Sequence, residues 1–482
     1  MNSKVYQSGL KFMLLNTVKR LYNGDVIFHH SLDKGIYATI VSSVTIDQNE
    51  MSKIKNHMIS MVNSNIPFNK KVVSKQEAYN FYLNKGYDEK ADNVLNISNL
   101  TVSMFEYEGQ YNYFYSHNMP ASTKEVPLFD IYFIRNNELV LIYPTNGEIQ
   151  FTFRNKVYGC FHEYDAWLNR LNINYVRDVN KIVAEGHIKD LIKKNDIKVD
   201  QDLYQIAKDI IINNKRIALI AGPSSSGKTT TSKKLSLYLS SLGYNAKPLS
   251  LDDFFRNRDE TPLDEFGQKD YECLEALDLS LFNNTLNELL SGRPVKLPRY
   301  NFIAGMKEFA ETETVLKEND ILVIEGLHAL NPNLIQNQDL SLYYKIYISP
   351  LTPLNVDRHN YISTTDNRLI RRIVRDFRTR GRSAEASLAT WDSVRRGEEK
   401  YIFPYTDTCD AILNTAYAYE IGVLKVYIEP LLYSIKMDSK FYGEARRLLD
   451  NLKTFYSIPS EFVSHENLLR EFIGGSVFEE EK

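Results

Sequence analysis

The composition of this 482-residue chain, with 43% hydrophobic and 25% charged residues, is that of an ordinary globular protein. Its formal net charge of −3 excludes a bulk electrostatic attraction to nucleic acid or to an anionic membrane. No apolar run approaches the ~18 residues of a membrane span, and Lys11 and Asn16 interrupt the N-terminal stretch that a signal peptide would need. The three cysteines are far apart and form no C-x-x-C pair, so we expect a cytoplasmic protein.

The N-terminal region, residues 1–170, is expected to fold as an α+β domain. Apolar residues recur at helical spacing from Leu10 to Leu21, which predicts an amphipathic helix. The other patterns in this region are those of strands. They are a run at 36–41 and a hairpin of 129–133 and 138–143 with Asn136–Asn137 at its turn.

Parts of this region resemble the editing domain of threonyl-tRNA synthetases. The similar stretches are residues 8–21, 30–37 and 117–123. The paired histidines of that family's first helix fall on Ser8 and Phe12, and a later histidine falls on Asn118. The resemblance therefore implies the editing-domain fold with a degenerate site. The alternative is a retained scaffold that binds RNA or a regulatory small molecule.

Because these histidines are replaced, we expect no stoichiometric zinc and no hydrolysis of mischarged tRNA. A zinc site needs three or four ligands at set spacing, and none can be assembled from the scattered candidates. Those candidates are His29–His30, His117 and the pair Cys160 and His162. Elemental analysis showing one zinc per chain, or release of amino acid from mischarged tRNA, would contradict this expectation.

Residues 171–206 are expected to link the two halves as two helices around a turn near Asn195–Asp196, with their charges on a solvated face. Residues 222–229 then fit G-x-x-x-x-G-K-[ST], the phosphate-binding loop. A buried strand is predicted before the loop, at 215–221, and a helix after it, at 230–242. This strand–loop–helix order is the context that the motif requires.

The chemistry of the loop follows from its backbone and its two polar end residues. Gly222 and Gly227 let the chain curl so that N–H groups point at an anion. Lys228 would reach the β- and γ-phosphates of a nucleotide, and the Thr229 hydroxyl would hold Mg²⁺. The predicted ATP-binding residues of the loop are Gly222, Pro223, Ser224, Ser225, Ser226, Gly227, Lys228, Thr229 and Thr230.

Carboxylates follow two further predicted strands. Asp252 and Asp253 come after the strand that ends near Leu251, and Glu325 ends the apolar run 320–325. Ligands of an open α/β sheet bind at the carboxyl ends of its strands. We therefore predict Asp252 as the base for a substrate hydroxyl and, with Glu325, as part of the Mg²⁺ site. Asp253 is predicted to cap the next helix, and an ordinary strand-end or capping role is the alternative for the other two.

A cluster of arginines is predicted on one face of a helix. They are Arg368, Arg371, Arg372 and Arg375, continued by Arg378, Arg380 and Arg382. Such a face is either solvated or neutralised by anions, from nucleic acid or from ATP phosphates under a lid. We favour the lid, because a phosphate-binding loop shares the domain.

Together these motifs resemble the uridine kinase family of P-loop nucleoside kinases, over roughly residues 215–415. The resemblance implies a parallel sheet flanked by helices, ATP and Mg²⁺ as cofactors, and phosphorylation of a nucleoside 5′-hydroxyl. It also implies a role for each matching residue: Asp252 as base; Thr229, Asp252 and Glu325 around Mg²⁺; Arg375 and Arg380 on ATP; Glu272, Tyr300, Arg372 and Arg382 at the nucleoside.

Three positions depart from the family's pattern. Its ribose-binding Asp becomes Glu272, its pyrimidine-reading His falls on Gly305, and a lid-side Gln falls on Thr390. A kinase of another small alcohol or sugar phosphate, or a nucleotide-driven RNA-binding regulator, is therefore the alternative. The expected domains are 1–170, the linker 171–206, the kinase domain 207–435 and a helical extension 436–482 with helices at 442–452 and 468–473, which suits packing or a homo-oligomer.

Overall fold

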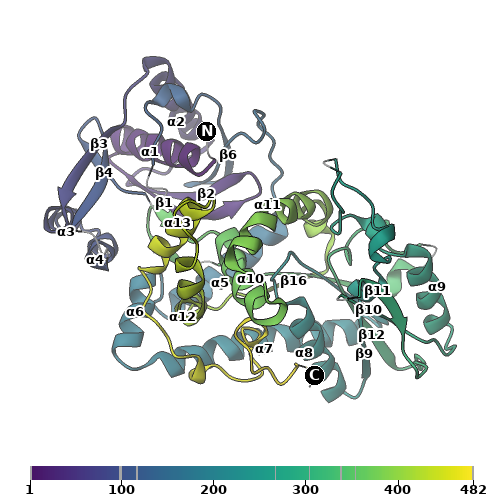
Figure 1. The fold of residues 1–482 in the computed structure, drawn as a ribbon. Helices are drawn as coiled ribbons and strands as arrows, with labels where there is room; N and C mark the ends of the chain where they lie inside the picture. The colour runs from purple at the N-terminus through teal and green to yellow at the C-terminus, as the bar shows by residue number, and fades with distance from the viewer. Residues whose placement is uncertain are drawn as a thin grey trace. The chain divides into compact units, whose positions relative to one another are not determined.

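The computed structural model describes residues 3–96, 100–114, 118–265, 267–302, 304–336, 339–352 and 354–479. The chain, traced in Figure 1, forms two compact units, and each unit is assembled from separate stretches of sequence. Unit 1 consists of Met1–Lys189, Thr352–Asn367 and Ala418–Ile458. Unit 2 consists of Asp190–Leu351, Arg368–Tyr417 and Pro459–Lys482. The contiguous domain boundaries expected from the sequence stay predictions.

Unit 1 has the expected α+β character, with two antiparallel sheets. The first sheet has the order β1 (Asp25–Leu32), β2 (Gly35–Val41), β7 (Glu138–Ile142) and β6 (Asp130–Arg135). The second has the order β3 (Asn69–Ser74), β4 (Thr101–Tyr107) and β5 (Gln110–Asn112). The predicted strand at 36–41 and the predicted hairpin are confirmed. Asn137 supplies the left-handed backbone of the hairpin turn, with φ +66°.

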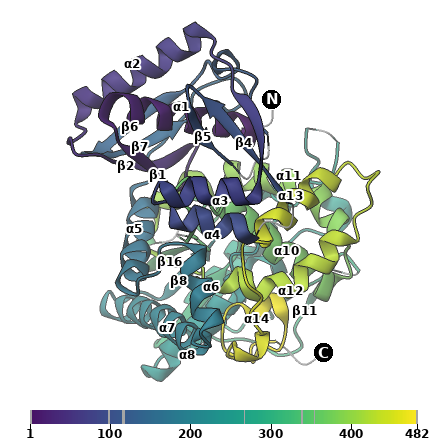
Figure 2. The same ribbon diagram turned by 90° about the vertical axis from the view of Figure 1, so that its left-hand side faces the viewer.

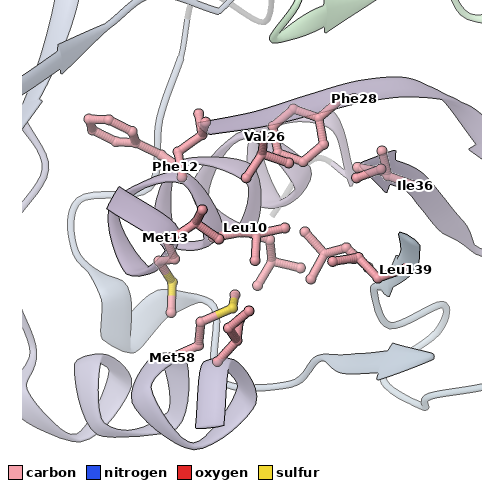
Figure 3. Packing of buried hydrophobic residues seen from close by; sticks show 14 of the residues in the cluster. Leu10, Phe12, Met13, Val26, Phe28, Ile36, Met58 and Leu139 are labelled. Carbon is pink, nitrogen blue, oxygen red and sulfur yellow. The ribbon is translucent and has the colours of Figure 1, made fainter. Parts of the chain in front are cut away.

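Unit 1 also contains helices, two of which, α3 and α4, lie side by side in Figure 2. The helices are α1 (Ser3–Tyr22), α2 (Gln48–Ser64), α3 (Lys75–Asn84), α4 (Asp88–Asn96), α5 (Asn155–Arg170), α6 (Val176–Ala184), α12 (Glu420–Tyr433) and α13 (Tyr442–Leu452). Figure 3 shows Leu10 and Met13 of α1 packed among apolar side chains of β1, β2, β7 and α2. The helix predicted at 10–21 is confirmed. Its buried surface is wider than an amphipathic stripe, because even Lys11 and Asn16 are buried.

A short hairpin from late in the sequence completes unit 1. It consists of β14 (Asn355–Asp357) and β15 (Asn360–Tyr361). The fully buried carboxylate of Asp357 pairs with the fully buried Lys90 at 3.1 Å and accepts the Tyr113 hydroxyl at 3.0 Å. A buried ion pair is tolerated only where its remaining hydrogen-bonding capacity is used. These contacts therefore hold the hairpin within the core of this unit.

Unit 2 is built on a five-stranded parallel sheet flanked by helices, as predicted for the C-terminal half. The strand order is β16 (Ala411–Asn414), β13 (Tyr343–Ser349), β8 (Ile217–Ala221), β12 (Asp320–Glu325) and β9 (Asn245–Ser250). A separate hairpin pairs β10 (Pro298–Asn301) with β11 (Met306–Phe309). The helices are α7 (Ile188–Ile212), α8 (Lys228–Ser241), α9 (Leu279–Leu290), α10 (Thr364–Arg380), α11 (Ala384–Tyr401) and the short α14 (Arg470–Ile473).

The predicted turn near Asn195–Asp196 is wrong, because α7 runs through both residues without a break. The Asn195 side-chain amide donates to the Leu191 carbonyl at 2.9 Å, so it bonds along the helix instead of ending it. The turn between α6 and α7 falls at residues 185–187. The two helices predicted near the C-terminus are confirmed as α13 and α14. Within the described ranges, no helix combines the length and apolar character that a membrane crossing requires.

Candidate functional site

The loop between β8 and α8 is shaped to hold an anion. Ser225 and Gly227 have left-handed backbones, with φ +62° and +92°, which turn successive N–H groups toward one side. A Cβ on Gly222 would lie 2.4 Å from the Ile348 carbonyl oxygen, so only glycine fits there. The buried hydroxyls of Ser225 and Ser226 have no hydrogen-bond partner within the described part of the chain. The loop thus keeps donors available beside the start of a helix, where anions are favoured.

Three side-chain oxygens converge next to this loop. The hydroxyl of Thr229 donates to Glu325 Oε1 at 3.1 Å, and the hydroxyl of Ser250 donates to the same oxygen at 3.0 Å. They meet because β12 lies between β8 and β9 in parallel register, so the three strands end at one edge. Lys228 Nζ donates to the Gly222 carbonyl at 3.0 Å, which folds its ammonium group back over the loop. Sequence reasoning missed Ser250, although its position just before Asp252 at a strand end was a usable signal.

The residues at this sheet edge fit a magnesium ion. Hydroxyl and carboxylate oxygens are the ligands that Mg²⁺ prefers. Burial and then the negative charge of Asp252 raise the pKa of Glu325 to about 7, while Lys228 and the two hydroxyl donors act in the opposite direction. A cation between Glu325 and Asp252 would relieve this repulsion, so the geometry accepts the ion that the phosphate-binding loop implies.

We expect Glu325→Gln to raise the melting temperature of the metal-free protein at pH 8. The pKa of Glu325 rises on folding from 4.5 to about 7, so its contribution to stability is complete below pH 4.5 and is lost as the pH rises through 7. A neutral glutamine has no charge to bury, so it removes this loss. Thermal melting in EDTA between pH 5.5 and 8 measures it, with the exposed Glu318→Gln as control. If the melting temperatures of wild type and Glu325→Gln changed with pH in the same way, folding would not raise the pKa of Glu325.

The two aspartates after β9 have different surroundings. They lie in a 3-10 turn, η2 (Leu251–Phe254), whose N-cap is Ser250, so the prediction that Asp253 caps the next helix is wrong. Asp253 Oδ1 instead accepts the Tyr300 backbone N–H at 3.1 Å, which ties the end of β9 to β10. Asp252 is exposed and close enough to Glu325 to raise its pKa. Asp252 is therefore the more exposed of the two carboxylates.

The arginines of α10 do not form one ligand-facing surface, which corrects the expected arginine face. Arg368 is fully buried and binds both carboxylate oxygens of Glu398, at 2.5 and 2.7 Å. Glu398 also accepts the Ser224 backbone N–H at 2.9 Å, and Arg372 donates to the Ser224 hydroxyl at 2.9 Å. Arg371 donates to the Thr415 carbonyl at 2.7 Å. Arg368, Arg371 and Arg372 are thus used to build unit 2, and the first and last of them brace the phosphate-binding loop.

We expect Glu398→Ala to cost about 3–5 kcal/mol of folding free energy, because it leaves Arg368 buried without its charge partner. The Glu398 side chain is fully buried, and its removal also breaks the hydrogen bond that it accepts from the Ser224 backbone N–H. Denaturant unfolding measures the loss. The matched control is Glu399→Ala, whose partly exposed pair with Arg395 should contribute less than about 1 kcal/mol. Equal free energies of unfolding for the two variants would show that the Glu398 contacts with Arg368 and Ser224 do not stabilise unit 2.

The remaining predicted ligand residues are three arginines in the last turns of α10 or just after it, and Glu272. Arg375 and Arg380 both approach the buried Asp376, at 2.9 and 3.4 Å. Arg382 is exposed after α10. Burial, and then the charge of Glu398, raise the pKa of Glu272 to about 7, with Arg372 and Lys228 opposing. The binding of ATP by Arg375 and Arg380, and of the acceptor by Glu272 and Arg382, stays a prediction.

Tyr300 and its neighbours form an aromatic cluster on the β10–β11 hairpin. The buried Tyr300 ring meets Phe255 and Phe302 edge to face, at 5.8 and 5.0 Å between centroids. The turn residue Gly305 has φ +72°, and a Cβ there would lie 2.7–2.9 Å from atoms of the Arg258 side chain. An arginine therefore occupies the space beside Gly305. The sequence offered no signal for this residue, because Arg258 lies far from Gly305 along the chain.

The histidine candidates of unit 1 that the structure describes do not gather into a metal site. Among the described residues, no group of three or more His, Cys, Asp and Glu is placed to hold a metal ion. His29 contacts the Thr39 hydroxyl at 2.9 Å, and His30 stacks on Phe161. His162 lies 2.9 Å from Arg135. His117 lies outside the described residues. The expectation of no zinc stays a prediction.

The C-terminal half of the chain is similar in sequence to known proteins. Residues 217–421 match the Phosphoribulokinase / Uridine kinase family model. A uridine kinase of Halobacterium salinarum is 26% identical over 196 residues, which is 40% of this chain and 77% of the relative. One of Macrococcus caseolyticus is 29% identical over 196 residues, 40% of this chain and 85% of the relative. A solved D-glycerate 3-kinase from Cryptococcus neoformans covers 57% of this chain and 89% of its own, at 14% identity and a TM-score of 0.25.

The C-terminal part of the chain therefore contains a domain of the phosphoribulokinase and uridine kinase family. The family match begins at residue 217, so the resemblance of residues 1–170 to a synthetase editing domain stays a prediction.

Proposed function

We propose that this protein uses ATP and Mg²⁺ to phosphorylate the 5′-hydroxyl of a uridine- or cytidine-like nucleoside. The observation that carries the proposal is the meeting of Thr229, Ser250 and Glu325 beside a phosphate-binding loop, with Asp252 at the neighbouring strand end. The family match and the names of the similar uridine kinases support it.

The chain's own groups would act mainly by positioning and by charge stabilisation. The loop N–H groups and Lys228 would hold the phosphates, while Thr229, Asp252 and Glu325 would hold the ion. When bound, Mg²⁺ supplies positive charge to the oxygens of the transferred group. Asp252, exposed at the strand end, would accept the proton of the acceptor hydroxyl. Arg375 and Arg380 on ATP, and Glu272, Tyr300 and Arg382 at the acceptor, keep the assignments that the family resemblance implies. Arg372, which the resemblance also places at the nucleoside, is engaged with the Ser224 hydroxyl.

Arg258 favours a second candidate, the phosphorylation of a sugar phosphate or another anionic alcohol. Its side chain fills the space beside Gly305, where the resemblance places a base-reading histidine. The guanidinium group donates to the Phe302 carbonyl at 2.6 Å, and the residue is exposed. A guanidinium group prefers carboxylate or phosphate to a neutral base. Arg258 therefore suits an acceptor that carries its own negative charge.

A screen of phosphate acceptors with the purified full chain tests the proposal. We expect ATP consumption, with Mg²⁺ present, to rise with uridine or cytidine and to yield the 5′-monophosphate. Phosphorylation of sugar phosphates alone, lost in Arg258→Ala, would establish the second candidate instead. ATP hydrolysis that rises only with tRNA would replace both with a nucleotide-driven RNA-binding regulator.

A further inference from the structure

The C-terminal segment of unit 2, residues 459–479, places a carboxylate on the helix that follows the phosphate-binding loop. Glu471 Oε2 accepts the Thr230 hydroxyl at 2.7 Å and faces the Thr230 backbone N–H at 3.4 Å. Thr230 is in the first turn of α8, where backbone N–H groups have no partner within the helix. The N–H groups of this turn are among those that a phosphate-binding loop offers to a nucleotide. An internal anion therefore occupies part of the site.

Contacts on both sides of Glu471 hold the segment in this position. Arg378 donates to the Glu471 carbonyl at 2.9 Å and to the Phe472 carbonyl at 3.2 Å. Lys233, one turn along α8 from Thr230, donates to the Phe478 carbonyl at 2.8 Å. The yellow end of the chain accordingly lies beside α8 in Figure 1. Glu471 is thus fixed by the fold at Thr230, and its contact there is not that of a loose terminal side chain.

We propose that Glu471 sets the nucleotide affinity of this site by competing with a nucleotide phosphate for Thr230. The inference rests on the proposed function, because it assumes that the loop binds ATP. A carboxylate and a phosphate repel each other and need the same N–H and hydroxyl donors of Thr230. ATP binds only after the C-terminal segment withdraws Glu471. The apparent affinity for ATP then equals the intrinsic affinity multiplied by the fraction of molecules in which the segment has withdrawn.

Equilibrium binding of a fluorescent, non-hydrolysable ATP analogue in Mg²⁺ tests the competition. We expect Glu471→Gln to bind the analogue about tenfold more tightly than the wild type, since the charge that strengthens the internal contact is gone. Glu461→Gln removes the same charge from an exposed position in the same segment and should bind like the wild type. Equal or weaker binding by Glu471→Gln would overturn the inference alone. Absence of binding by the wild type and by both variants would overturn the proposed function, and the inference with it.

Hydrogen exchange of the wild-type chain supplies a test that needs no variant. Addition of the ATP analogue is expected to speed exchange of the backbone amides at 465–479, because the segment leaves α8. Unchanged or slower exchange there, at a nucleotide concentration that saturates the site, would show that Glu471 stays in place and would overturn the competition.

Discussion

Lys228→Ala is expected to lower the turnover of phosphoryl transfer by about 10³-fold. A loss of this size is typical when one preorganised hydrogen-bond donor that stabilises developing negative charge is removed. The Lys228 ammonium lies at the loop itself, 3.0 Å from the Gly222 carbonyl, where the β- and γ-phosphates of ATP are expected. No uncharged alanine can replace that interaction.

The same substitution should leave the fold intact, because the Lys228 ammonium donates its hydrogen bonds to backbone carbonyl oxygens of the loop, at 3.0 and 3.5 Å. Turnover and thermal melting are measured together, with the exposed Lys296→Ala as a control for loss of one positive charge. Turnover close to that of the wild type, in a folded Lys228→Ala protein, would remove the loop from the mechanism.

Asp252→Asn is expected to lower turnover by ~10²-fold or more, the scale of general-base catalysis. The asparagine keeps the shape of the side chain, but it can neither take the proton of the acceptor hydroxyl nor lend a negative charge to the Mg²⁺ site. ATP affinity, measured separately, should change much less, since the loop and Lys228 are untouched.

Asp253→Asn is the matched control for this experiment, because it changes the neighbouring carboxylate in the same way. The Asp253 side chain accepts the Tyr300 N–H, and an asparagine oxygen can still accept that hydrogen bond. Its turnover should therefore stay near that of the wild type. If Asp253→Asn abolishes turnover and Asp252→Asn does not, the base has been assigned to the wrong aspartate.

The parts of unit 2 that were predictable from sequence are those encoded by neighbouring residues. The loop at 222–229 shows its glycines, Lys228 and Thr229 as one contiguous motif, and the apolar run at 320–325 ends visibly in an acid. Parallel strands ending at one edge then bring Thr229 and Glu325 to 3.1 Å. Local pattern and the general rule for α/β sheets were sufficient here.

Local pattern was misleading where a polar residue has a partner inside the fold. Spacing placed the arginines of α10 on a common face, but it could not show that Arg368 is fully buried against Glu398. Likewise the sequence predicts a turn at Asn195, whose side-chain amide instead bonds along α7 to the Leu191 carbonyl. A side chain's partner, and not its type, decides whether it faces solvent, a ligand or the core.

The sequence by itself determined the phosphate-binding loop, the strand ends that carry Asp252 and Glu325, and most helices and strands, because these depend on short spacings and on periodicity. Only the tertiary structure decided what surrounds them. Glu398 reaches Ser224 across 174 positions of sequence, and Glu471 reaches Thr230 across 241. No local preference encodes such pairs, since they form only when packing of the whole unit brings distant segments together.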